Sequence, residues 1–203
     1  MMAMTKEAED FLILCAHGKR KDLEKALSMG ANPNEVFYPA DGLRKNALDI
    51  AVSMNNTDAA EVLIQHGANP NFQDYNGRTA LMYAVLVSSE MVETLLNNGA
   101  DPNIQDMIGR TPLIMAVSGR DIVVQDFFAS LIRTGGLRAE DSDKWTLTAF
   151  MYAAICRNLQ IESIKILLEH GANASLCDNK GMNARTYAMA SDDDEIFMML
   201  MGY

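Results

Sequence analysis

The chain has 203 residues, of which 49% are hydrophobic, and a formal net charge of −10. It contains no run approaching 18 apolar residues, so the composition predicts a soluble protein with a substantial core and no membrane span. The charge is uneven, because residues 1–46 carry seven basic and seven acidic side chains, whereas residues 47–203 carry ten basic and twenty acidic ones. Such a field disfavours nucleic acid and anionic membranes as partners. It either favours a partner with a basic face or serves solubility alone.

The N-terminal segment predicts a helical unit rather than a targeting signal. In residues 1–16 the acids precede the apolar stretch, which is the reverse of a secretory signal, so a cytoplasmic location is expected. The sequence leaves open whether the protein is exported into a host cell. Lys19, Arg20 and Lys21 interleave with Asp22 and Glu24 and have no aromatic residue beside them, which favours a solvated terminal cap over a basic binding patch.

A Gly-Ala pair ends an apolar helical stretch at regular intervals. Glycine there takes the left-handed conformation that closes a helix, and the Asn/Asp-Pro-Asn that follows predicts a turn. The five glycines are spaced 37, 32, 36 and 36 residues apart, which is typical of a stacked repeat. The copies are Gly30 to Asn34, Gly67 to Asn71, Gly99 to Asn103 and Gly171 to Ser175, with a degenerate copy at Gly135 and Gly136.

A second pattern follows each turn and predicts the start of a short helix. Thr or Asn stands first as an N-cap, the third position is apolar in four of five copies, and the sixth is Ala in all five. An invariable alanine predicts a close approach of two backbones. The copies occupy residues 46–51, 79–84, 111–116, 148–153 and 183–188.

These two patterns resemble the ankyrin repeat family, whose repeats read Gly-x-Thr-Pro-Leu-His-x-Ala at one helix start and Leu-Leu-x-x-Gly-Ala-Asp-x-Asn at the next helix end. Residues 106–116 and 95–103 match most closely. The resemblance implies an all-α solenoid of about six stacked helix-turn-helix units with projecting hairpin-like fingers, forming a single domain over residues 1–203. The expected units are about 5–36, 43–73, 76–105, 108–140, 145–177 and 180–203.

The chain departs from the family at the histidine of the helix start. Asp49, Met82, Ile114, Met151 and Thr186 stand in its place, so the usual threonine–histidine hydrogen bonds between neighbouring repeats are not expected. Methionine is unbranched and adaptable, and 15 of the residues are Met, so packing by methionine is expected to compensate.

The fingers carry the residues predicted to bind a partner. By resemblance, their tips and the exposed face of the first helices form a concave recognition surface. The first finger is about four residues longer than the others, and its aromatic pair either binds a partner or folds back over the edge of unit two. In the next two fingers a glycine makes the turn and leaves the arginine after it pointing outward. The expected partner-binding residues are Phe37, Tyr38, Tyr75, Arg78, Met107, Arg110, Lys144 and Trp145.

The last three units hold further expectations. The helix at about 122–133 is longer than its counterparts or follows a looser turn, and its Gly-Gly end predicts a local bend. In the last unit, Ser191 and the acids 192–195 favour helix capping over a cation site. The final helix, 196–201, is apolar throughout. It binds a partner, binds a second copy of an otherwise monomeric chain, or merely covers the end of the core.

The sequence predicts no catalytic residue, no cofactor and no metal. Cys15, Cys156 and Cys177 have neither disulfide nor metal spacing, which favours buried or half-buried thiols in a reducing compartment over redox sensing. His66 and His170 are each expected to bond a carbonyl at a helix end. An acidic protein-binding module, acting as a scaffold or adaptor for a folded partner, is therefore expected, and the alternative is an inhibitor or regulator of a partner enzyme. A third hypothesis, a ligand or catalytic site, concerns tyrosines that are otherwise expected to pack between repeats: Tyr83, Tyr152 and Tyr187.

Overall fold

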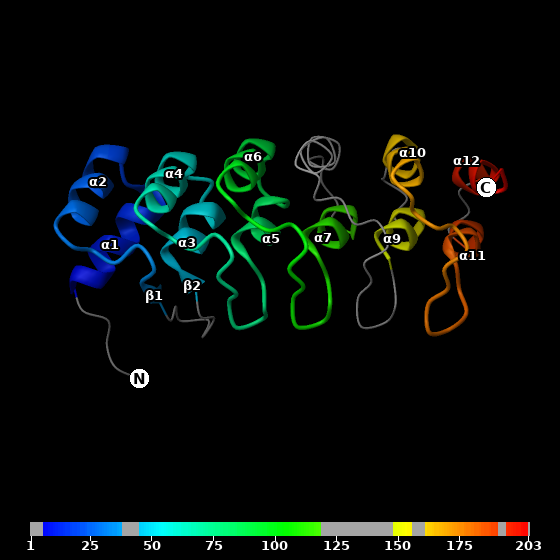
Figure 1. Cartoon of the computed structure of the whole chain (residues 1–203), viewed down its shortest axis with the longest axis horizontal. Helices are drawn as coiled ribbons and strands as arrows, with labels where there is room; N and C mark the ends of the chain where they lie inside the picture. Colours follow the sequence, from blue (N-terminus) through cyan, green and yellow to red (C-terminus); the bar gives the residue numbers. More distant parts are fainter. Residues whose placement is uncertain (1–5, 38–44, 119–147, 156–160, 191–193, 203) are drawn as a thin grey trace. The chain divides into compact units, whose positions relative to one another are not determined.

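The computed structural model describes residues 6–37, 45–118, 148–155, 161–190 and 194–202 (Figure 1). It divides into two compact units, residues 1–101 and 102–203. The predicted helix at 122–133, the looser turn predicted as an alternative before it, the bend predicted at its Gly-Gly end and residues 191–193 lie outside the described residues. The partition into six repeats within one domain stays a prediction.

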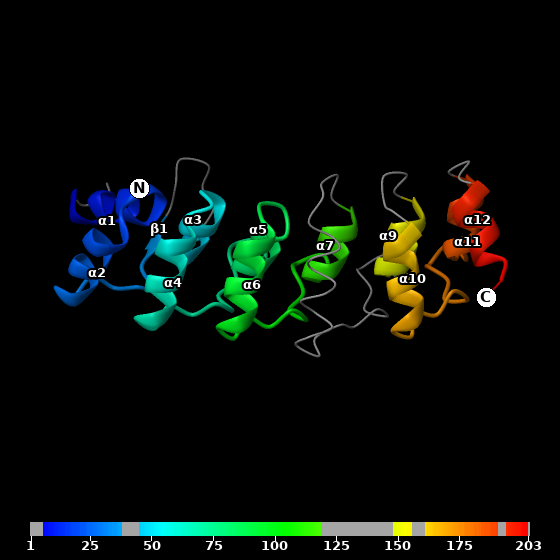
Figure 2. The ribbon, with the colours of Figure 1, turned by 90° about the horizontal axis from the view of Figure 1, so that it is seen from above.

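The described residues of the first unit form three helix pairs and one short strand pair, whose order along the chain is visible in Figures 1 and 2. Inner helices α1, α3 and α5 pack in succession, and the outer helices α2, α4 and α6 do the same. The strands pair antiparallel, with Val36 opposite Asn46. The elements are α1 Lys6–His17, α2 Arg20–Ser28, β1 Val36–Phe37, β2 Lys45–Asn46, α3 Ala47–Ser53, α4 Thr57–Gln65, α5 Ala80–Ala84 and α6 Ser89–Asn97.

The second unit repeats the arrangement. Inner helices α7, α9 and α11 pack in succession, while α10 lies on α9 and α12 lies on α11. The described elements are α7 Pro112–Ser118, α9 Ala149–Ile155, α10 Ile161–Glu169, α11 Ala184–Ala190 and α12 Asp194–Leu200. The expected mostly helical fold of helix pairs and fingers is confirmed.

The helices start and end at the residues that the sequence patterns predict. The side chain of Asn46 accepts a hydrogen bond from the backbone N–H of Asp49, and Thr111, Thr148 and Asn183 make the equivalent bond to the third residue of their helices. Thr79 is the exception, since its hydroxyl is buried without a hydrogen-bond partner. At the helix ends the glycines adopt positive φ, as expected: Gly30 101°, Gly67 89°, Gly99 87° and Gly171 88°.

The second asparagine of the Asn-Pro-Asn turn joins consecutive repeats. The Asn34 side chain donates to the Gly67 carbonyl at 2.9 Å and accepts from the Asn69 N–H at 2.8 Å. Asn71 repeats both bonds one turn later, to the Gly99 carbonyl at 3.1 Å and from the Asp101 N–H at 2.7 Å. Each asparagine therefore satisfies backbone groups of the next turn and fixes the register of the stack.

The predicted substitutes for the family's histidine lie in the core. Met82 and Met151 are 0% and 1% exposed and Ile114 is 0% exposed, so packing by methionine is confirmed at two repeats. Asp49 is also 0% exposed and is the charged exception. Thr186, in the last described repeat, is half-buried.

The sixth-position alanines mark a close approach between helices, and all five are at most 2% exposed. We expect Ala84→Leu to lower the free energy of unfolding by roughly 1–3 kcal/mol, because the added methylene groups have no space beside α3 and α6. Urea denaturation measures the change. The matched variant Ala190→Leu, at an exposed site, should change stability by less than about 0.5 kcal/mol. Equal losses in both variants would contradict the close approach.

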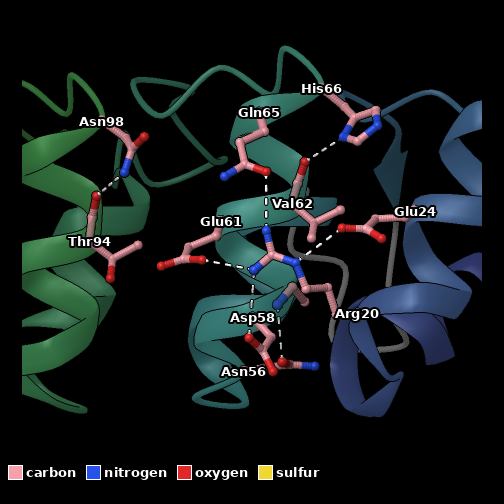
Figure 3. A network of polar contacts seen from close by, with 11 residues as sticks. Arg20, Glu24, Asn56, Asp58, Glu61, Val62, Gln65, His66, Thr94 and Asn98 are labelled. Atoms are coloured by element: carbon pink, nitrogen blue, oxygen red, sulfur yellow. Dashed lines mark hydrogen bonds and ion pairs between the residues drawn. The ribbon is translucent and has the colours of Figure 1, made fainter.

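Arg20 links the first outer helix to the second (Figure 3). Its guanidinium bonds Glu24 on α2 and Glu61 on α4, each at 3.0 Å, and also the Gln65 amide oxygen at 3.2 Å. The bond to Glu61 is the largest of the contributions that raise the pKa of Arg20. Arg20, the middle residue of the basic run 19–21, thus holds two helices of the stack together, which agrees with the expectation that this segment is a terminal cap and not a basic binding patch.

The histidines and one cysteine take structural roles. His66 Nδ1 lies 2.9 Å from the Val62 carbonyl (Figure 3). His170 Nδ1 lies 2.8 Å from the Ile166 carbonyl, so both histidines bond a carbonyl at a helix end as expected. Cys15 is buried, and burial raises the pKa of its thiol to about 12, which makes it a poor nucleophile. Cys177, expected to be buried or half-buried, is exposed.

Candidate functional site

Each described finger is built around a buried aspartate. Asp74 is 6% exposed, Asp106 7% and Asp178 7%. The Oδ1 atom of Asp74 accepts two hydrogen bonds, from the backbone N–H groups of Asn76 and Arg78, each at 2.8 Å. The Asp74 N–H in turn donates to the Arg78 carbonyl at 2.9 Å, which closes the loop. A short loop with this many internal bonds is held in one conformation.

The same loop recurs in the second unit. Asp106 Oδ1 accepts from Ile108 at 3.0 Å and Arg110 at 2.9 Å. In the last described finger, Asp178 Oδ1 accepts from Lys180 at 2.8 Å and Met182 at 2.9 Å. The three fingers are therefore one structural device repeated along the chain.

The other carboxylate oxygen of each aspartate ties the finger to its helix. The Tyr83 hydroxyl donates to Asp74 Oδ2, and the Tyr187 hydroxyl donates to Asp178 Oδ2 at 2.5 Å. Burial and this bond raise the pKa of Tyr83, while the bond from Tyr187 lowers the pKa of Asp178. In the third finger, where Met115 replaces the tyrosine, Arg110 fills the same place.

These contacts decide the role of the tyrosines. Tyr83 and Tyr187 each bond an aspartate of their own repeat, and the expected packing of these tyrosines between repeats stays a prediction. Tyr83 also makes one contact with the preceding repeat, since Lys45 Nζ lies 5.4 Å from its ring centroid. The third hypothesis, a ligand or catalytic site at these tyrosines, gains no support from this geometry.

The residue after each finger aspartate points into solvent. Tyr75 is 69% exposed, Met107 is 72% exposed, and Asn179 is also exposed. We call this residue the display position, meaning Tyr75, Met107 and Asn179. Two of the predicted contact residues therefore stand free on rigid loops.

The two arginines lie differently from the expectation. Arg110 does not point outward: its Nε and Nη2 bond Asp106 Oδ2 at 2.9 and 2.8 Å, because a buried carboxylate needs a partner. Arg78 is half-buried, and its Nε is buried without a hydrogen bond. Both guanidinium groups are therefore at least partly enclosed within the finger and do not extend fully into solvent.

The first finger is placed in part. Phe37 is 2% exposed and its ring centroid lies 6.4 Å from that of Phe11 on α1, so this side chain folds back, with its ring beside the first repeat; the expected covering of the edge of unit two stays a prediction. It covers the core and is not displayed to a partner. Tyr38, Lys144 and Trp145 lie outside the described residues. As contact residues they stay predictions.

The finger aspartate is the functional feature that the sequence reasoning missed. An aspartate stands five residues before every helix start. Asp is a common turn residue, so the pattern reads as ordinary turn chemistry until the burial of the carboxylate is known. The five positions are Asp41, Asp74, Asp106, Asp143 and Asp178.

Helix pairs joined by short rigid fingers define a repeat protein with exposed loop tips. A family model described as ankyrin repeats (3 copies) matches residues 11–106 and 124–203, and another, ankyrin repeats (many copies), matches residues 89–128. The chain belongs to the ankyrin repeat family. Ankyrin repeats are generally protein–protein interaction modules without catalytic activity of their own.

Two similar proteins are informative. The human 2-5A-dependent ribonuclease is 41% identical over 197 residues, covering 93% of this chain and 26% of the ribonuclease. The chain thus spans about a quarter of that relative's length. The crystal structure of EF0377, an ankyrin repeat protein, matches with a TM-score of 0.83 and 25% identity, covering 98% of this chain and 100% of EF0377.

Two features are absent from the described residues. No helix there has the length and apolar character needed to cross a bilayer. No group of three or more histidine, cysteine, aspartate or glutamate side chains is arranged to hold a metal ion in that part of the chain.

Proposed function

We propose that this chain is a scaffold or adaptor that binds a folded protein through its display positions and the adjoining concave face of the inner helices. The observation that carries the proposal is the pairing of a buried, fully bonded aspartate with a large exposed apolar neighbour. Tyr75 and Met107 each follow such an aspartate.

Preorganisation is the physical reason for the proposal. A partner that buries Tyr75 gains the apolar area of an aromatic side chain without the cost of ordering the loop that carries it. Tyrosine and methionine are enriched at protein interfaces, and tyrosine in particular among the residues that dominate binding energy. An isolated exposed apolar residue on a flexible loop would lack this advantage.

The charge of the chain supports a partner with a basic face. The twenty acidic side chains of residues 47–203 outnumber ten basic ones, so association with a basic surface gains long-range attraction. The alternative is that the charge serves solubility alone. A binding rate that falls steeply with salt supports the first reading, and a salt-independent rate contradicts it.

Tyr75→Ala and Met107→Ala should each weaken partner binding about tenfold or more. Affinity capture and mass spectrometry identify the partner, and titration calorimetry with that purified protein gives the affinities. Neither variant should change the unfolding midpoint, because both side chains are largely exposed. Met29→Ala, at a 78% exposed methionine outside the fingers, is the matched control. Unchanged affinity in both Tyr75→Ala and Met107→Ala would contradict the proposal.

The regulatory alternative has a separate test. If the identified partner is an enzyme, its rate is measured with saturating amounts of the chain. A changed rate indicates an inhibitor or regulator, and an unchanged rate leaves the scaffold reading.

A further inference from the structure

A buried carboxyl group lies in α3, the inner helix of the second pair. Asp49, in the first turn of α3, is 0% exposed. Its Oδ2 accepts the Asn46 N–H at 3.0 Å, whereas its Oδ1 is buried without a hydrogen-bond partner. A core carboxylate with an unbonded oxygen is costly when it is ionised and much less costly when it is neutral. The charge state of Asp49 therefore matters to everything packed around it.

The second finger, residues 74–78, supplies the negative charge that acts on Asp49. Burial is the first cause of the raised pKa of Asp49, which reaches about 7, and the charge of Asp74 raises it further. Lys45 on β2 acts in the opposite direction, and its Nζ also lies 5.4 Å from the ring centroid of Tyr83 on α5. Repulsion between two carboxylates is mutual. Ionisation of Asp49 therefore also acts on the aspartate that holds the second finger.

The other elements packed on α3 present neutral groups to it. They are α1, α4 and α5, and the side chains that these helices bury are apolar except for one thiol. That thiol is Cys15, and burial raises its pKa to about 12. Tyr83 on α5 also stays neutral, because burial and its bond to Asp74 raise its pKa. Within these described contacts, Asp49 is the group that changes charge near neutral pH.

The second finger is the part of this cluster that can yield. Residues 47–52 of α3 are all at most 9% exposed, so packing holds Asp49 in place. The finger depends on the hydrogen bonds of Asp74 instead. At the end of the finger, Thr79 starts α5 without the cap bond found at the starts of α3, α7, α9 and α11, and the neighbouring Arg78 Nε is buried without a partner. Repulsion between the two carboxylates therefore disturbs this loop before it disturbs α3.

We propose that Asp49 is a proton-sensitive switch for the second finger. With Asp49 neutral, Asp74 holds the loop in the ordered form that displays Tyr75. With Asp49 ionised, repulsion weakens the hold of Asp74 and the loop loosens. The effect of this change on partner binding rests on the function proposed above for Tyr75. The equivalent position of the three following inner helices carries a residue that cannot ionise: Met82, Ile114 and Met151.

Amide hydrogen exchange of the full chain at pH 5 and pH 8 tests the proposal without a partner. The protection factors of the Asn76 and Arg78 N–H groups are divided by those of Ile108 and Arg110, which make the equivalent bonds in the third finger. A loss of global stability lowers all four factors equally and leaves the ratio unchanged. From pH 5 to pH 8 the ratio should fall about tenfold, which is the effect of an interaction worth about one pKa unit.

Two variants assign the fall in this ratio to Asp49. Asp49→Asn should keep the ratio constant, because asparagine retains an oxygen for the Asn46 N–H and never ionises. Asp10→Asn, at an exposed site on α1, is the matched control and should show the same fall as the wild type. A ratio that is constant in the wild type, or that falls equally in Asp49→Asn, overturns the proposal. Unchanged partner affinity in Tyr75→Ala would count against the proposed function of the fingers and leave the exchange result intact, so the two proposals fail separately.

Discussion

Relative to the wild type, Asp49→Asn should be more stable at pH 8 than at pH 4. Asp49 is 0% exposed; its Oδ2 accepts the Asn46 N–H at 3.0 Å, and its Oδ1 has no hydrogen-bond partner. Burial, followed by the negative charge of Asp74, raises the pKa of Asp49 to about 7, against the opposing effects of the Asn46 N–H and Lys45. Asparagine keeps an oxygen for the Asn46 N–H and never ionises.

The sign of the pH dependence follows from the raised pKa. A carboxyl whose folded pKa lies above its unfolded value contributes stability below the unfolded value and loses it as the pH rises through the folded value. For a shift from 3.8 to about 7, the loss between pH 4 and pH 8 is on the order of 4 kcal/mol. The difference in free energy of unfolding between Asp49→Asn and the wild type should grow by that amount over the same interval.

Urea denaturation across this pH range measures the difference. Asp10→Asn, at an exposed site on α1, is the control and should show little pH-dependent difference from the wild type. A difference between Asp49→Asn and the wild type that stays constant from pH 4 to pH 8 would show that Asp49 titrates normally in the folded chain.

Asp74→Ala should lower the free energy of unfolding by about 2–4 kcal/mol and disorder the second finger. The change leaves the N–H groups of Asn76 and Arg78 and the Tyr83 hydroxyl without their acceptor. Asp74→Asn retains the Oδ1 acceptor and should lose less than half as much. Urea denaturation gives the stability, and amide hydrogen exchange at Asn76 and Arg78 reports the order of the loop. Unaltered exchange in Asp74→Ala would mean that the loop does not depend on its aspartate.

The repeats were predictable because their boundaries depend on local chemistry. The positive φ of Gly67, the cap at Asn46 and the buried alanine at 84 are each demanded by a few neighbouring residues.

The site was less predictable because its side chains contact residues in other elements of the fold. Arg110 bonds Asp106 in a repeat that has Met115 where two other described repeats have a tyrosine bonded to the finger aspartate, so the sequence of the finger alone does not place its guanidinium. Phe37 is buried because α1 presents Phe11 to it, a contact between segments about one repeat apart. Tyr75 and Met107 were predictable as tips, since each lies two residues before the glycine of a finger turn.

The central claim is that rigid fingers present their display positions to a protein partner. Its most direct test is the affinity of the identified partner for Tyr75→Ala and Asp74→Ala, measured beside Tyr83→Phe, which removes the hydroxyl bond to Asp74 but keeps both N–H bonds to Oδ1. We expect Tyr75→Ala and Asp74→Ala each to weaken binding about tenfold, and Tyr83→Phe to weaken it by a smaller factor. If the partner binds the disordered finger of Asp74→Ala as tightly as the wild type, the claim is wrong.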